Sequence, residues 1–250
     1  MEESLDIREC ESIGDLTGCV RLQKAVFGLP DIEISPVRHL VVTKSAGGFT
    51  LGAFAGGELI GFVLSVPAVL RGERAFYSHM TAVSKNVQGT GVGAKLKWAQ
   101  RTRALAAGVR YIKWTFEPWK ARNAFFNLEK LGAAVKQLQP DFYGIDLATA
   151  DQSSGPAPLA SDRLFAEWDL QSPKVTALAA GEKFAETREP AARIAIATDW
   201  DGLVKSNAHA AFEEQIRIRR EFTAAFDAGL AGEGFERGDG RAEYLLFKDR

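Results

Sequence analysis

Hydrophobic and polar positions recur with a clear period along most of the chain, and this period predicts its helices and strands. In the first half, the runs "FTLGAFA" and "ELIGFVLSV", separated by a Gly-Gly turn, are typical of a β-hairpin. Apolar residues three or four positions apart indicate helices between the strand segments. We expect strands at residues 4–10, 49–55, 58–66, 74–84 and 109–117, and helices at residues 13–28, 92–107 and 121–131.

The second half continues with the same two patterns. A long helix is predicted at residues 207–228, and a closing hairpin around an Asp-Gly turn at residues 234–247. Residues 149–162 are rich in Pro and small polar residues and are predicted to be a loop, and residues 200–202 a turn. Further strands are expected at residues 134–147, with a bend at Pro140, and at residues 163–170 and 191–198. The buried face of the long helix is expected to carry Ala208, Phe212, Ile216, Phe222 and Phe226.

This order of elements predicts the α/β (α+β) class, with a mixed, largely antiparallel twisted sheet flanked by helices. We expect one domain at residues 1–170 and a smaller β-α-β-β extension at residues 171–250. The extension either packs on the sheet or extends it. Whether it is a separate domain stays open at this stage, because the predicted loop at 149–162 can also connect two paired strands.

Composition and charge narrow the function classes. A formal net charge of −1 and a pI near 6.4 give no general attraction to nucleic acid or to an anionic membrane. Between Lys85 and Arg122, however, nine Lys or Arg residues face the single acid Glu117. This local excess favours a small polyanion as ligand.

The remaining composition indicates a reduced, cytoplasmic protein. Cys10 and Cys19 cannot form a disulfide framework in a chain of 250 residues and lack the spacing of a metal site. The first residues are acidic and do not resemble a signal peptide. The longest apolar run, "LIGFVLSVPAVL", is about half the length of a membrane-spanning helix. We therefore expect neither a metal nor a membrane partner.

The stretch from Gln88 to Gly93 joins a strand to a helix through three glycines. Such a loop exposes successive backbone N–H groups at the positive end of a helix, which is a binding site for an anion. The loop is not a Walker A motif, because no Gly-Lys-Ser/Thr follows it. It is a poor dinucleotide fingerprint, because a hairpin precedes it instead of a parallel βαβ unit. A glycine-rich turn without a ligand is the alternative.

The loop resembles motif A of the GNAT acyltransferase superfamily, in which a hydrophobic strand ends in Val and Gln/Arg-x-x-Gly-x-Gly/Ala follows. Val83, Gln88, Gly91 and Gly93 match this pattern, whereas Lys85 replaces the usual Pro. Downstream, "ARNAFFNLEKLGA" is similar to a later helix of the family, and the resemblance covers about residues 4–170.

The resemblance implies a fold with a splayed strand pair and a site for acetyl-CoA or another acyl-CoA. The pantetheine arm would pair with the strand at Ala82 and Val83, and Asn123 would contact coenzyme A. Lys85, Lys95 or Arg122 would meet the 3′-phosphate. The loop around the pyrophosphate would comprise Gln88, Gly89, Thr90, Gly91, Val92, Gly93 and Ala94.

Acyl transfer to an amine also needs a base and an acid for the leaving thiolate. The family commonly supplies the acid from a Tyr before "EKLG", where this chain has Leu128. Candidate catalytic residues are His79 as base, Glu117 after the next strand, and Tyr143 as a substitute acid. Each has a plain structural alternative: a hydrogen-bonded histidine in the sheet, a surface ion pair, and a core tyrosine.

Arg219 is predicted on the apolar side of the long helix, where it would bind a substrate carboxylate or, alternatively, lie along apolar surface. The leading function is an N-acyltransferase that moves an acyl group from acyl-CoA to an amine of a small molecule or a protein by direct attack. The rival is a non-catalytic acyl-CoA or anion-binding module on the same scaffold. No nucleic-acid partner is expected, and a homodimer stays open.

Overall fold

The computed structural model describes residues 5–144, 159–238 and 240–249. The chain forms two compact units, Met1–Lys113 and Trp114–Arg250. The boundary between them lies inside strand β5 (Tyr111–Phe116). The predicted boundary at residue 170 therefore falls within the second unit, and the two-domain division stays a prediction.

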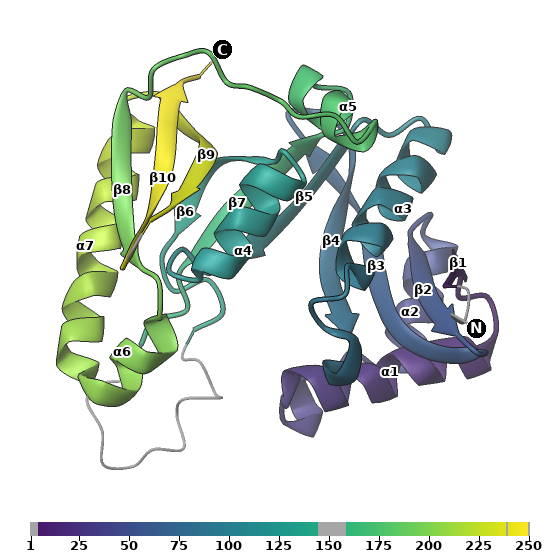
Figure 1. Cartoon of the computed structure of the whole chain (residues 1–250). Helices are drawn as coiled ribbons and strands as arrows, with labels where there is room; N and C mark the ends of the chain where they lie inside the picture. Colours follow the sequence, from purple (N-terminus) through teal and green to yellow (C-terminus); the bar gives the residue numbers. More distant parts are fainter. Residues whose placement is uncertain (1–4, 145–158, 239, 250) are drawn as a thin grey trace. The chain divides into compact units, whose positions relative to one another are not determined.

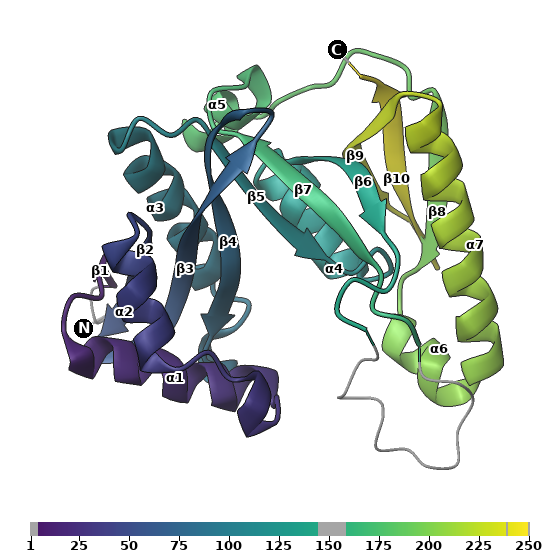
Figure 2. The same cartoon turned by 180° about the vertical axis from the view of Figure 1, so that it is seen from behind.

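The first unit is a sheet with helices on both faces. β1, β2, β3 and β4 are neighbours in this order, and each pair is antiparallel. The start of β5 pairs in parallel with residues 75–77 of β4. Helix α3 covers one face of the strands, and α1 and α2 cover the other (Figures 1 and 2). The elements are β1 (Asp6–Glu9), α1 (Ile13–Phe27), η1 (Asp31–Glu33), α2 (Val37–Ser45), β2 (Phe49–Ala55), β3 (Glu58–Leu70), β4 (Glu73–Val83), η2 (Lys85–Val87) and α3 (Val92–Ala106).

Strand β4 contains one residue more than its partner β3 needs. Leu64 lies opposite Met80 and the next residue, Ser65, lies opposite Ser78, so His79 is the extra residue of a β-bulge. A bulge changes which face of the sheet the following side chains meet. This irregularity lies four residues before the end of β4.

A polar network joins α3 to the strands beneath it. Lys97 is 3% exposed and donates from Nζ to Ser78 Oγ at 3.0 Å. The buried Gln100 donates to the same hydroxyl at 3.1 Å and to Ser65 Oγ at 2.8 Å. Helical spacing in the sequence predicts an apolar stripe of Val92, Leu96, Ala99 and Ala106 on this helix. Val92 and Leu96 are buried as predicted, whereas the rest of the observed buried face is Lys97, Gln100 and Ala104.

The second unit is built on the strand order β5-β7-β6-β9-β10-β8. β9 and β8 both pair antiparallel with β10, so β8, α7 and β9 form a split β-α-β arrangement with β10 between its strands. The elements are α4 (Ala121–Phe125), the π-turn η3 (Phe126–Lys130), β6 (Ala134–Gln139), β7 (Arg163–Asp169), α5 (Pro173–Ala179), β8 (Ala192–Ala197), α6 (Trp200–Ser206), α7 (Ala208–Asp227), β9 (Leu230–Arg237) and β10 (Arg241–Lys248).

The C-terminal extension continues the sheet of this unit through the pair β6 and β9. Val135 lies opposite Gly232, where an added Cβ would come within 2.6 Å of a Val135 methyl group. Only glycine fits that position without a shift of its neighbour. The buried Tyr244 of β10 donates its hydroxyl to the Pro118 carbonyl at 2.7 Å. The extension is thus packed into the unit by both backbone pairing and side chains.

The predicted α/β class with a largely antiparallel sheet is confirmed. Two local predictions are wrong, and one helix was missed. Residues 200–202 begin helix α6, because Asp199 accepts from Gly202 N and caps it. The strand predicted at 134–147 ends at Gln139, and a turn begins at Pro140. α5 was not predicted. Most of the predicted loop at 149–162 lies outside the described residues.

The buried face of α7 also differs from the prediction. Phe212 and Ile216 are 37% and 39% exposed. Residues of the observed face are spaced alternately by four and three positions and are Ala211, Gln215, Ile218, Phe222 and Ala225. None of the helices among the described residues is long and apolar enough to cross a membrane.

The buried Lys97 predicts a pH-dependent stability. Burial lowers the pKa of Lys97 from 10.5 to about 7. Between these values the unfolded chain binds more protons than the folded one, so the free energy of unfolding rises with pH by roughly 1 kcal/mol per unit. Lys97→Met should stabilise the protein at pH 7 by roughly 2–4 kcal/mol and flatten this slope, as measured by urea unfolding from pH 7 to 10.

The exposed Lys95 on the same helix is the matched control. Lys95→Met should change the free energy of unfolding by no more than about 0.5 kcal/mol at any pH of the range, and should therefore leave its slope with pH as in the wild type. Equal slopes in Lys97→Met and the wild type would contradict the assignment of this pH dependence to Lys97.

Candidate functional site

The glycine loop between β4 and α3 has the geometry of an anion site. Gly91 is the N-cap of α3, with a φ of 92°, and no side chain among the described residues caps the helix. A Cβ added at Gly89 or Gly91 would have no atom within 4 Å, and one at Gly93 would meet only Val83 at 3.7 Å. The space above the loop is therefore open, and the first backbone N–H groups of α3 border it. This space and these donors fit a phosphate.

Two side chains brace the loop, and one of them bonds to the preceding strand. Gln88 donates from Nε2 to the Val83 carbonyl at 3.0 Å, and Thr90 donates from Oγ1 to the Val87 carbonyl at 2.8 Å. Gln88 was predicted to lie at the pyrophosphate. In the structure its amide nitrogen holds the end of β4 and the loop together, so the main chain of the loop provides the open donors.

The last part of β4 has an unpaired side within the first unit. β3 pairs with β4 along its whole length, whereas the pairing of β4 with β5 described in this unit ends at Tyr77. Beyond this point come Ala82, which is buried, and Val83. The predicted pantetheine contacts thus lie on a strand with an edge free for pairing among the described residues of this unit.

His79 lies at the β-bulge, three residues before Ala82. Its ring keeps exposed surface, and its Nε2 is 3.5 Å from Ser35 Oγ. Loss of hydration first, and the electrostatic interaction with His39 second, lower the pKa of His79. A neutral imidazole on an exposed ring can accept a proton, which suits the predicted role as a base.

The other predicted catalytic residues belong to the second unit. Glu117 directly follows β5 and is partly buried, and Asn123 is exposed on α4. Tyr143 is 56% exposed, and its hydroxyl is 3.4 Å from Thr115 Oγ1. The core-tyrosine alternative for Tyr143 is therefore wrong. No described hydrogen bond connects Glu117, Asn123 and Tyr143 to one another, and their roles stay predictions.

Leu128, at the position where the resemblance places an acidic Tyr, is fully buried in the π-turn. The neighbouring Asn127 is 4% exposed and accepts at Oδ1 from Trp114 Nε1 at 3.3 Å. This part of η3 is core, and it provides no proton donor to the surface at position 128.

Arg219 has an internal partner. Its Nε and one NH2 nitrogen donate to the two carboxylate oxygens of Asp162 at 2.8 and 2.7 Å, and Asp162 is 1% exposed. Asp162 also accepts from Asp141 N at 3.0 Å. The fork of Arg219 is thus engaged by a buried carboxylate of the same unit, and substrate binding by Arg219 stays a prediction without support from this geometry.

Two residues near His79 were not found from the sequence. Ser35 and His39 lie about forty residues earlier, in the segment before α2 and in its first turn. Neither belongs to a motif, and only the fold brings them to β4. Among the described residues, no group of three or more His, Cys, Asp and Glu is arranged to hold a metal ion.

Comparison with known protein families matches part of this chain to one of them. The family model described as Acetyltransferase (GNAT) family matches residues 15–133. This range contains most of α1, the bulged strand and the glycine loop. No curated protein matches the chain.

Solved structures show the same fold at low sequence identity. A structure assigned to the GNAT acetyltransferases, from Desulfovibrio desulfuricans, is 14% identical, with a TM-score of 0.53, and the match covers 67% of this chain and 99% of that one. The ribosomal-protein-S18-alanine N-acetyltransferase from Escherichia coli is 13% identical, with a TM-score of 0.52, and the match covers 74% of this chain and 98% of that one. An N-acetyltransferase from Staphylococcus aureus Mu50 is 14% identical, with a TM-score of 0.51, and the match covers 67% of this chain and 99% of that one.

The loop conformation predicts different costs for two glycines. Gly91 has a φ of 92°, which L side chains rarely adopt, whereas Gly93 has no positive φ and lies in the first turn of α3. Gly91→Ala should lower the free energy of unfolding by about 1–2 kcal/mol, and Gly93→Ala should leave it unchanged or raise it slightly. Urea unfolding of both variants measures this, and equal effects would contradict the left-handed conformation at Gly91.

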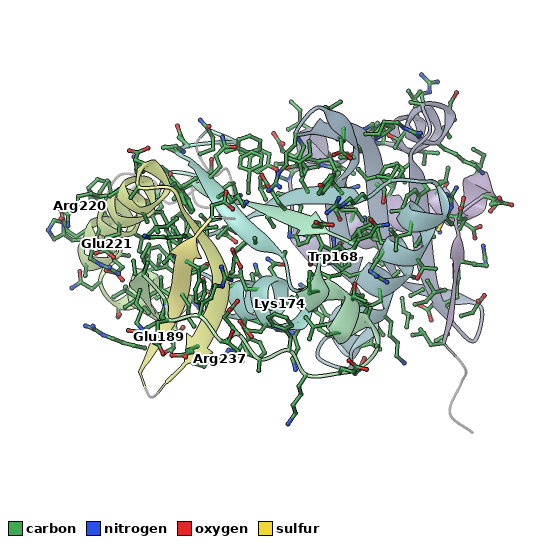
Figure 3. All side chains as sticks on the ribbon, turned by 90° about the horizontal axis from the view of Figure 1, so that it is seen from above. Trp168, Lys174, Glu189, Arg220, Glu221 and Arg237 are labelled. Atoms are coloured by element: carbon green, nitrogen blue, oxygen red, sulfur yellow. The ribbon has the colours of Figure 1, made fainter. Side chains whose placement is uncertain are left out.

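The Arg219–Asp162 pair predicts a structural role. Arg219→Met leaves a buried carboxylate without its cation and should lower the free energy of unfolding by about 2 kcal/mol. Arg220, at the outer surface of α7 (Figure 3), is the control, and Arg220→Met should cost less than about 0.5 kcal/mol. Chemical unfolding of both variants decides, and an unchanged stability of Arg219→Met would exclude the structural role.

Proposed function

Residues 15–133 are a domain of the GNAT acetyltransferase family, and we propose that the protein transfers an acyl group, most simply acetyl, from acyl-CoA to an amine by direct attack. The observation that carries the proposal is the open, uncapped glycine loop at the start of α3, beside a bulged strand that presents His79. The matching family and fold supply the reaction class. The acceptor and the acyl length belong to the proposal alone.

In this proposal the backbone of the loop holds the pyrophosphate of coenzyme A. The free edge of β4 at Ala82 and Val83 pairs with the pantetheine arm and directs it along the strand toward His79. Acyl-CoA supplies the thioester whose carbonyl carbon the amine attacks. Gln88 keeps the loop in register with the strand end through its bond to Val83, so the two contacts are fixed relative to each other.

His79 removes a proton from the attacking amine. An alkylammonium has a pKa near that of Lys, about 10, so most of the amine is protonated at neutral pH and a base is needed. The lowered pKa of His79 keeps its imidazole neutral at pH 7 and ready to accept the proton. Glu117 and Tyr143 are proposed as additional acid-base groups, and the side chain of Tyr143 is exposed.

One observation favours the rival, a binding module without catalysis. Leu128 is fully buried where the resemblance places the acid, so the chain lacks a proton donor at that position. The module would hold acyl-CoA or another anion at the same loop.

The acceptor of the enzyme is proposed to be an amine on a small molecule or a protein. A cytoplasmic location is proposed with it, since Cys10 and Cys19 are free, buried thiols.

Binding of acetyl-CoA to the loop is tested by calorimetry and thermal unfolding. A ligand that binds only the folded state at a concentration of about 100 times Kd should stabilise it by about 2.7 kcal/mol. Gly91→Glu places a negative charge at the anion site and should abolish this stabilisation. Gly108→Glu is the matched control, because Gly108 also has a positive φ, is open to solvent and follows the other end of α3.

The catalytic step is tested by release of free coenzyme A from acetyl-CoA with a panel of amines. The wild type should release free coenzyme A with at least one amine. His79→Ala should bind acetyl-CoA normally, but its release of free coenzyme A should be at least a hundredfold slower. Binding without release for any amine would favour the module. Absence of binding by every acyl-CoA would refute both functions.

A further inference from the structure

Gln23 holds the segment before α2 in one position. This residue of α1 is only 2% exposed. Its Oε1 accepts from Ser35 N at 2.8 Å, and its Nε2 donates to the Ser35 carbonyl at 3.2 Å. A buried amide that bonds both backbone groups of one residue fixes that residue in place. Gln23 thus fixes the backbone of Ser35.

The hydroxyl of Ser35 lies between two imidazoles. It is 3.2 Å from His39 Nδ1 and 3.5 Å from His79 Nε2. The two rings have their centroids 5.8 Å apart and meet edge to face at 71°. A hydroxyl has one proton to donate, so it can donate to one ring only and must accept from the other. Ser35 therefore couples the tautomers of His39 and His79.

Only one direction of the hydrogen bonds from Ser35 to the two histidines leaves Nδ1 of His79 able to act as a base. If Ser35 donates to His39 Nδ1, it accepts from His79 Nε2–H, and His79 Nδ1 keeps its lone pair. Among the described residues, Nδ1 of His79 has no hydrogen-bond partner. The exposed ring and the unbonded nitrogen leave this lone pair for a proton from outside the protein.

We propose that Gln23, Ser35 and His39 position His79 for proton abstraction by holding its ring in the tautomer with Nδ1 free. This inference rests on the proposed acyl transfer. His79 is the catalytic residue, and the other three act through it. The bulge brings the ring of His79 to the start of α2, and Ser35 selects which nitrogen accepts the proton. In the step, the amine proton binds Nδ1 of His79 while the proton on Nε2 stays in its bond to Ser35.

His39 has a second effect on His79. After the loss of hydration, the electrostatic interaction with His39 is the second cause that lowers the pKa of His79. The other polar groups of this cluster, Gln23 of α1 and Ser35 before α2, carry no charge. Removal of His39 should therefore raise the pKa of His79. The acidic limb of the activity profile, where activity rises as His79 loses its proton, should move to higher pH.

The first test is substrate-independent. The chain has three histidines, and His209, in α7 of the second unit, serves as an internal reference. A ¹⁵N NMR titration of the imidazoles reports the tautomer and the pKa of each ring. In the wild type His79 should carry its neutral proton on Nε2. Ser35→Ala should give a mixture of tautomers, and His39→Asn, which keeps an acceptor for Ser35, should keep the tautomer but raise the pKa of His79.

The second test measures acyl transfer with the best amine of the panel. Ser35→Ala should lower kcat about tenfold and leave the KM for acetyl-CoA unchanged, and Ser35→Thr, which keeps the hydroxyl, should restore most of the rate. Gln23→Leu, which removes the clamp, should lower kcat in the same way. His39→Asn, which keeps an acceptor for Ser35, should shift the acidic limb of the profile upward. Ser45→Ala, at the exposed end of α2, is the control and should change neither kcat nor the profile.

The two tests separate this inference from the proposed function. If Ser35→Ala keeps the wild-type tautomer and pKa of His79, or keeps the wild-type kcat and pH profile, the positioning role is wrong. If the wild type transfers no acyl group but the NMR changes occur, the proposed function fails while the coupling of the three side chains stands. The melting temperature of Ser35→Ala should stay within a few degrees of that of the wild type. If Ser35→Ala is unfolded at the assay temperature, Ser35→Thr takes its place in both tests.

Discussion

The extra residue in β4 is the constraint on which the arrangement of the first unit depends. Met80 and Ala82 pack with the core formed by α1 and α2. By simple alternation Ser78 would face the same side, but the bulge at His79 turns Ser78 toward Lys97 and Gln100 of α3. The one inserted residue thus has two effects. It directs Ser78 to its hydrogen bonds with α3, and it brings the imidazole of His79 itself to the start of α2. The anion loop follows from the same strand, so its place relative to the base is set by the short stretch of β4 between them.

The elements that sequence predicted correctly are those whose signal is local. The hairpin of β2 and β3, the strand before the loop and the long α7 each have a period that one segment contains. The faces of helices were predicted less well, because burial is decided by what packs against them. Lys97 and Gln100 are buried since Ser65 and Ser78 lie beneath them, and no periodicity of apolar residues can indicate this. On α7, small and polar residues such as Ala211 and Gln215 form the contact.

The same distinction applies to the candidate site. The glycine loop, Ala82, Val83 and His79 are contiguous in the sequence, so a motif was enough to find them. Ser35 and His39 could not be found, because the approach of α2 to β4 depends on the packing of the whole unit. Arg219 was predicted from its place on α7, yet its partner Asp162 is 57 residues earlier and could not be identified from periodicity. Pairing of charges across such distances is a property of the fold.

The joining of β9 to β6 has a consequence for how the second unit folds. The hydroxyl of Tyr244 reaches the carbonyl of Pro118 across a sequence separation of 126 residues, and β6 gains β9 as its neighbour only after nearly a hundred further residues have been placed. Contacts between residues so distant in sequence form late, because the entropy of closing a long loop must be met first. Until β9 arrives, β6 is an open strand edge that another chain can pair with. Slow refolding and aggregation at high concentration are therefore expected to have their origin at this edge, and the close fit of Gly232 against Val135 is the contact that ends the exposure.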